Sequence, residues 1–89
     1  MTMKERIAAK LTSALRPTSL DVVDESHRHA GHAEARAGGE SHFRVYIVSE
    51  DFAGKGRIER HRLVNAALAD EFAAGVHALA LTTLAPGEA

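Results

Sequence analysis

The first part of the chain carries a clear helical pattern. One apolar residue recurs at every fourth position, which places four side chains on one helical face: Met3, Ile7, Leu11 and Leu15. Thr2 and Glu5 have the spacing of a capping box, in which each side chain bonds to a backbone donor at the start of the helix. Pro17 disfavours helical backbone at Arg16, so we expect the helix to end there.

Two stretches with strand character follow, separated by a long polar connection. Residues 20–25 (LDVVDE) contain β-branched side chains. From Phe43 to Val48 the pattern has a period of two, with Phe43, Val45 and Ile47 on one side of the predicted strand. We expect the two stretches to pair as an antiparallel hairpin. Their connection, at about residues 27–40, is rich in histidine and longer than a usual hairpin loop.

The second half of the chain predicts a turn, a long helix and a last strand. The helix is expected from Arg57 to Ala74, and Gly75 is suited to end it. Five residues are expected on its buried face: Ile58, His61, Val64, Leu68 and Phe72. The run from Val76 to Thr83 is almost entirely apolar, as in a strand that is covered on at least one face.

This order of elements, helix, strand, strand, helix, strand, predicts a small α+β domain with a three-stranded mixed sheet. The second and third strands are joined through the long helix, so we expect them to be parallel, with a right-handed crossover. At 89 residues, the whole chain (1–89) is expected to form a single domain.

The amino-acid composition argues against several classes of function. The formal net charge is −1, from 11 basic and 12 acidic residues, so overall charge makes no case for binding nucleic acid. The chain contains no cysteine, which excludes disulfides, thiolate metal sites and thiol catalysis. No signal peptide, spanning helix or association with membranes is predicted, and we expect a cytoplasmic protein. No nucleotide-binding loop, nucleophile elbow or pair of acids is found, so we expect no enzymatic activity.

Histidines are concentrated in the long connection. His27, His29 and His32 lie within six residues, and imidazole is a common ligand of zinc, copper, iron and nickel. Three imidazoles without a fourth ligand make a poor structural zinc site. Each of them taken singly is better explained as an ordinary residue of a solvated loop. The hypothesis that at least one is a ligand depends on a histidine elsewhere.

That residue is His77, at the start of the last predicted strand. One interpretation is a core histidine that is hydrogen-bonded through one nitrogen. The other is a ligand at the sheet edge, where a rigid strand would fix the direction of the ring. A fixed imidazole and a movable one form half of a metal site, and a partner would have to bring the remaining ligands. For His61 we predict a core position, and for His42 a structural role.

A cluster of basic residues surrounds the start of the long predicted helix: Lys55, Arg57, Arg60 and Arg62. Asp70 and Glu71 lie near its other end. This arrangement opposes the preference of the helix dipole, so it does not serve helix stability. An anion-binding role, for phosphate or carboxylate, and a solvated basic face with weak ion pairs explain it equally well.

The chain resembles the BolA family. The motifs VVDES, SHFRV, F-x-G-K, RHRLVN and VHALAL occur in this order, and the resemblance extends from about Leu20 to Pro86. It implies a class II KH-like α-β-β-α-β fold with the helices packed on one face of the sheet. It also implies a partnership with a monothiol glutaredoxin, in which the two proteins hold a [2Fe–2S] cluster and the glutaredoxin cysteine and glutathione supply the sulfur.

The resemblance further implies two histidine ligands in this chain. His77 matches the VHAL motif, and the second ligand comes from the connection between the first two strands. Counted from its start, the pattern ES-x-x-H places this ligand at His29. Counted back from SHF, it falls nearer His32, because this connection is longer than is usual in the family. The order of preference is His29, then His32, then His27. Two imidazoles on one iron raise the potential of a cluster, as in Rieske centres, and make ligation sensitive to pH. Such a shared cluster suits assembly, transfer or sensing.

Two other hypotheses stay open. Some family members are reported as DNA-binding regulators, so the basic cluster could contact DNA, although Gly54-Lys55-Gly56-Arg57 lacks the GxxG spacing of a KH domain. The third hypothesis is a zinc or copper protein that binds the metal through the histidine-rich connection alone. The sequence is also compatible with a weak homodimer.

Overall fold

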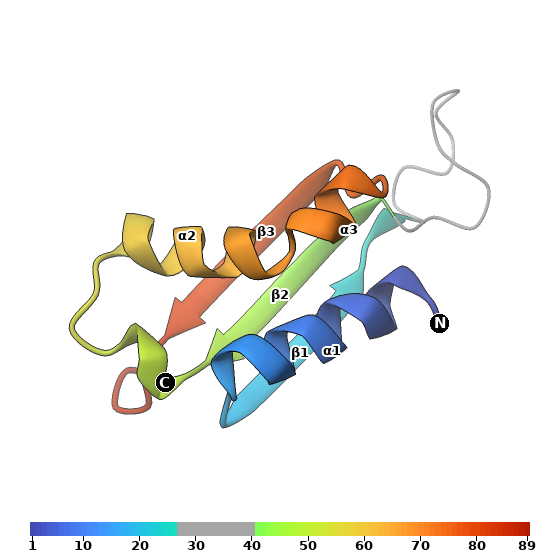
Figure 1. The fold of residues 1–89 in the computed structure, drawn as a ribbon. Coiled ribbons are helices and arrows are strands. Elements are labelled where there is room, and N and C mark those ends of the chain that lie inside the picture. The colour runs from blue at the N-terminus through green and yellow to red at the C-terminus, as the bar shows by residue number, and fades with distance from the viewer. Residues whose placement is uncertain (27–40) are drawn as a thin grey trace.

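The computed structural model describes residues 1–26 and 41–89. Its elements, in chain order, are α1 (Met3–Leu15), β1 (Ser19–Asp24), β2 (His42–Val48), a short 3-10 helix η2 (Glu50–Phe52), α2 (Arg57–Ala67), α3 (Ala69–Ala73) and β3 (Ala78–Leu84). The sheet has the order β1-β2-β3, and β2 pairs antiparallel with β1 and parallel with β3. The helices cover one face of this sheet (Figure 1). The predicted α+β class with a three-stranded mixed sheet is confirmed.

Helix α1 forms as its sequence predicts. The Thr2 hydroxyl accepts a hydrogen bond from the backbone N–H of Glu5 at 3.1 Å, and the Glu5 carboxylate accepts one from the Thr2 N–H at 2.8 Å. All four residues of the apolar stripe are buried. The helix ends at Arg16, which adopts a left-handed conformation (φ 44°) directly before Pro17.

The core lies between the sheet and the helices. Alternate residues of the strands point into it, so that Val22 of β1 is paired with Val45 of β2 and both are buried. Phe52, from η2, is completely buried and belongs to the same core. On the opposite face of the sheet, Val23 and Tyr46 are partly exposed. None of the helices among the described residues is long and apolar enough to cross a membrane.

The long predicted helix consists of two helices. The backbone leaves helical geometry at Leu68 (φ −105°, ψ 16°), which separates α2 from α3. Val64 and Leu68 are buried as predicted, and His61 and Phe72 are half-buried. Ile58 is 70% exposed, so its predicted burial was wrong. At 3.6 residues per turn, a residue six positions before Val64 lies about 120° away from it around the helix.

The last strand begins later than predicted, at Ala78, so that Val76 and His77 precede it. Gly75 ends α3 with a positive φ of 127°, a conformation that glycine adopts without strain. The pairing of both strand pairs agrees with the prediction. The predicted hairpin connection, residues 27–40, lies outside the described residues.

A buried ion pair joins α3 to α1. The Glu71 side chain is 1% exposed, and its Oε2 accepts hydrogen bonds from Nε and Nη2 of Arg6 at 3.2 and 3.0 Å. Lys10 Nζ lies 3.5 Å from Oε1, the other carboxylate oxygen. The helical pattern of α1 does not predict this contact, because Arg6 and Lys10 lie outside its apolar stripe.

Candidate functional site

His77 lies on the surface at the point where β3 begins. Its side chain is exposed, and its backbone N–H donates a hydrogen bond to the carbonyl of Ser41 at 2.8 Å. The same carbonyl accepts a bond from the N–H of Ala78 at 3.2 Å. The backbone of His77 is thus fixed against the start of β2, while its ring is accessible. The first interpretation, a histidine in the core, is contradicted, because the side chain is exposed.

His42, the first residue of β2, lies beside His77. The centres of the two imidazole rings are 6.4 Å apart, and the ring planes are inclined at 36°. Nδ1 of His42 lies 2.9 Å from the hydroxyl oxygen of Ser41, within hydrogen-bond distance. Sequence reasoning assigned His42 a structural role and did not pair it with His77. The only available signal was the parallel alignment of the two strands, which pairs His42 with Ala78.

A buried serine holds together the two backbone segments that flank residues 27–40. The hydroxyl of Ser26 accepts hydrogen bonds from the N–H groups of Ser41 and His42 at 2.8 and 3.0 Å. The N–H of Ser26 in turn donates to the Asp24 carboxylate at 2.8 Å. Both Ser26 and Ser41 are buried. The position of His42, and with it the neighbourhood of His77, is therefore set by an ordered network.

The other predicted ligands, His27, His29 and His32, lie outside the described residues. Within residues 1–26 and 41–89, no group of three or more histidine, aspartate or glutamate side chains could hold a metal ion. The described residues bring two imidazoles together, those of His42 and His77.

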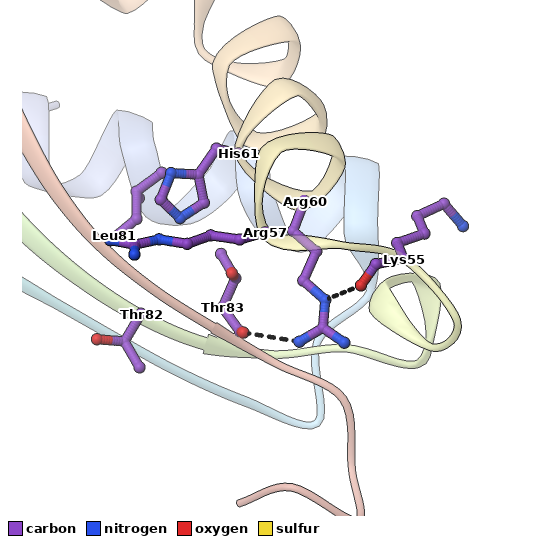
Figure 2. Close-up of a pocket in the computed structure, with 7 residues that line it drawn as sticks. All are labelled: Lys55, Arg57, Arg60, His61, Leu81, Thr82 and Thr83. Atoms are coloured by element: carbon purple, nitrogen blue, oxygen red, sulfur yellow. Dashed lines mark hydrogen bonds between the residues drawn. The ribbon is translucent and has the colours of Figure 1, made fainter.

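The basic cluster borders a pocket of about 440 Å³ between the start of α2 and β3. Figure 2 shows the residues that line it: Lys55, Arg57, Arg60, His61, Leu81, Thr82 and Thr83. No acidic residue is among them. Arg62, the fourth predicted anion-binding residue, is exposed but does not line the pocket.

Arg60 is held by contacts inside the molecule. It donates hydrogen bonds to the carbonyls of Lys55 at 2.8 Å and Thr83 at 3.0 Å (Figure 2). Its guanidinium also binds both carboxylate oxygens of Glu88, at 2.6 and 2.9 Å, and lies 6.0 Å from the centre of the Phe52 ring. With a side chain only 11% exposed, Arg60 connects α2 to the end of β3. With Arg60 engaged in these contacts, Arg57 is the cation whose side chain lies along the pocket, whereas the side chain of Lys55 extends away from it (Figure 2).

The contact between Arg60 and Glu88 is expected to depend on pH. Hydrogen bonds from Arg60, with a further one from the backbone N–H of Ala85, lower the pKa of Glu88 from 4.5 to about 2. Because the folded-state pKa is the lower one, the contact contributes its full stabilisation above about pH 4.5 and loses it as the pH falls towards 2. An NMR titration of the Glu88 carboxyl carbon is expected to show this low midpoint.

The matched variants for this titration are Arg60→Gln and Arg57→Gln. Arg60→Gln is expected to move the pKa of Glu88 back towards 4.5. Arg57→Gln is expected to leave it unchanged, since no bond joins Arg57 to Glu88 in the described structure. A midpoint near 4.5 in the unmodified protein would contradict the contact.

Comparisons with known proteins identify the family. The family model described as BolA-like protein matches residues 11–88. An uncharacterized protein from the 5′ region of cobS in Sinorhizobium is 51% identical over 99% of this chain and 96% of its own length. The DNA-binding transcriptional regulator BolA of Escherichia coli is 48% identical over 93% of this chain and 75% of its own.

A solved structure agrees with these sequence matches. The BolA domain of SufE1 from Arabidopsis thaliana superimposes with a TM-score of 0.86 at 41% identity, over 98% of this chain and 95% of that one. The order of elements, the mixed sheet and the sequence matches lead to the same result. The chain belongs to the BolA family.

Proposed function

We propose that this protein is an iron–sulfur accessory protein. It binds a monothiol glutaredoxin and contributes histidine ligands to a [2Fe–2S] cluster that the two proteins share with glutathione, for cluster assembly, transfer or sensing. The observation that carries the proposal is the exposed ring of His77 on a backbone fixed by Ser41, in a chain without cysteine.

The donor chemistry of the chain fits such a cluster. Imidazole replaces thiolate on one iron of Rieske centres, so a cluster iron accepts histidine ligands. His77 would be the fixed ligand, and the second would come from residues 27–40, with His29 preferred over His32 and His27. When bound, the cluster would supply an electron-accepting centre and transferable iron and sulfide.

The residues around His77 favour ligand exchange with a partner. Its ring needs no rearrangement of the core to reach a cluster at the surface, because the side chain is already exposed. The bonds from His77 and Ala78 to the Ser41 carbonyl limit the movement of its backbone. A ligand held in this way loses little conformational entropy on binding.

Mixing the protein with cluster-loaded glutaredoxin and glutathione tests the proposal. We expect the visible spectrum to change from that of all-thiolate ligation to that of mixed thiolate and histidine ligation. Anaerobic co-purification is expected to yield a heterodimer that contains about two irons and two sulfides per pair. His29→Ala is expected to weaken the change more than His32→Ala or His27→Ala. Co-purification with an unchanged spectrum would contradict histidine ligation.

DNA binding is the second candidate function. It is supported by the cationic pocket, which no acidic residue lines, and by the relative in Escherichia coli that is named a DNA-binding transcriptional regulator. Contacts to phosphate release counterions, so the logarithm of the affinity should fall with the logarithm of salt concentration, by about 0.9 per phosphate.

A salt titration of binding to duplex DNA separates this function from the first. The variants Lys55→Gln and Arg57→Gln are expected to reduce the slope, whereas Arg62→Gln, outside the pocket, is the matched control. A slope near zero would exclude binding through phosphates.

A further inference from the structure

His42 and His77 form a pair that the sheet itself constructs. The parallel register aligns His42 with Ala78, which places the residue before Ala78 next to the start of β2. The two bonds to the Ser41 carbonyl fix this alignment, and the Ser26 hydroxyl fixes the backbone of Ser41 and His42. Two imidazoles that are 35 positions apart in the sequence are thus neighbours on ordered backbone.

The spacing of the rings suits a shared cation. With metal–nitrogen bonds of about 2.0–2.1 Å, two imidazoles on one metal have ring centres separated by roughly 5 Å at a tetrahedral angle and roughly 6.4 Å when trans. The observed separation is 6.4 Å. The His77 side chain is exposed, so rotation of its ring would change the 36° inclination of the two rings.

The Ser41 hydroxyl is placed to orient the imidazole ring of His42. This hydroxyl lies 2.9 Å from Nδ1, and in the tautomer in which Nδ1–H donates to it, Nε2 carries the lone pair that a metal would bind. Metal-binding histidines usually have the other ring nitrogen hydrogen-bonded in this way, which orients the ring and sets the tautomer. The buried Ser41 would therefore be the outer-sphere hydrogen-bond partner of His42.

We propose that His42 and His77 form a site for a divalent transition-metal ion on this chain alone. It is distinct from the glutaredoxin-dependent cluster, because it needs neither the partner nor residues 27–40. Two neutral imidazoles favour borderline metals, and the expected order of affinity is Cu²⁺ above Ni²⁺, with the remaining positions occupied by water.

The test uses tag-free protein in which His27, His29 and His32 are all replaced by alanine. Of the six histidines, this variant retains His42, His61 and His77. Calorimetric titration with Ni²⁺ is expected to show one ion bound per chain. His42→Ala or His77→Ala in this background is expected to weaken binding at least about tenfold, whereas His61→Ala, the matched control, is expected to leave it unchanged.

A second measurement localises the ion and verifies the fold. Substoichiometric Cu²⁺ is expected to broaden the amide signals of Ser41 and Ala78 in the same background, in a spectrum that otherwise matches that of the unmodified protein. The proposal is overturned if the variant without His27, His29 and His32 binds no Ni²⁺, or if His61→Ala weakens binding as much as His77→Ala. These results do not bear on cluster binding, which is measured with glutaredoxin.

Discussion

His77→Ala is expected to abolish the spectral change that the protein produces in cluster-loaded glutaredoxin. The reason is that His77 is the proposed cluster ligand that lies among the described residues, on backbone bonded to Ser41, so its loss leaves a single imidazole from residues 27–40. One imidazole alone would replace a thiolate less effectively than two, and the cluster iron would regain thiolate or solvent ligands. The measurement is the visible absorption and circular dichroism spectrum of the anaerobic mixture, with glutathione present.

His61→Ala is the matched control for this prediction. His61 is half-buried on α2 and lines the basic pocket, away from the start of β3. Its replacement is expected to leave the spectrum of the mixture intact. His77 is exposed, so its replacement should change the free energy of unfolding by less than about 0.5 kcal/mol. A normal mixed-ligand spectrum with His77→Ala would refute the ligand role.

Arg6→Met is expected to lower the free energy of unfolding by about 3 kcal/mol. It removes both hydrogen bonds to Glu71 Oε2 and leaves a carboxylate that is 1% exposed without its main partner. Lys10 remains 3.5 Å from the other oxygen, so the loss should be at the lower end for a broken buried ion pair. Urea denaturation followed by circular dichroism measures the change.

A second substitution separates buried charge from lost packing. Glu71→Leu, combined with Arg6→Met, is expected to recover most of the stability, because a buried ion pair replaced by apolar residues is often neutral or better. Arg44→Met is the matched control. Its partner is Glu25, with an Nε–Oε2 distance of 3.0 Å, and both side chains are more exposed than in the Arg6–Glu71 pair, at 57% and 14% against 36% and 1%. Exposed pairs contribute about 1 kcal/mol or less. Equal losses for Arg6→Met and Arg44→Met would show that burial of Glu71 has no energetic consequence.

The elements that the sequence predicts best are those whose pattern depends on neighbours along the chain. In α1, the fourfold apolar spacing, the capping box and Pro17 are all local, and each has the predicted outcome. The alternation in β2 identifies Phe43, Val45 and Ile47 as buried in the same way. Such features result from helix and strand geometry alone.

The errors arise where tertiary packing decides. The apolar residue Ile58 was assigned to the buried face by its chemistry, although its angular position on α2 points away from the core. The break at Leu68 contains neither glycine nor proline, so no local signal marks it. The burial of Glu71 depends on the packing of α3 against α1, which sequence spacing does not encode.

In the candidate site, too, local features could be predicted from the sequence and tertiary contacts could not. The motif around His77 was visible in the sequence, as was the basic cluster. The pairing of His77 with His42 was not, because it results from the parallel register of two strands that are far apart in the chain. The internal role of Arg60 was also hidden, since its partners Thr83 and Glu88 come from the end of the chain.

The hydroxyl of Ser26 has an evolutionary consequence. Because it joins the backbone on both sides of residues 27–40, the distance between those two sides is independent of what lies between them. Doubling the length of a connection between fixed ends costs only about 0.6 kcal/mol of chain entropy. Insertions, deletions and exchanges of donor type can therefore accumulate in this interval while β2 and the histidine before β3 keep their places. The amino-acid sequence of residues 27–40 can therefore change without disturbing the sheet on which both flanking segments lie.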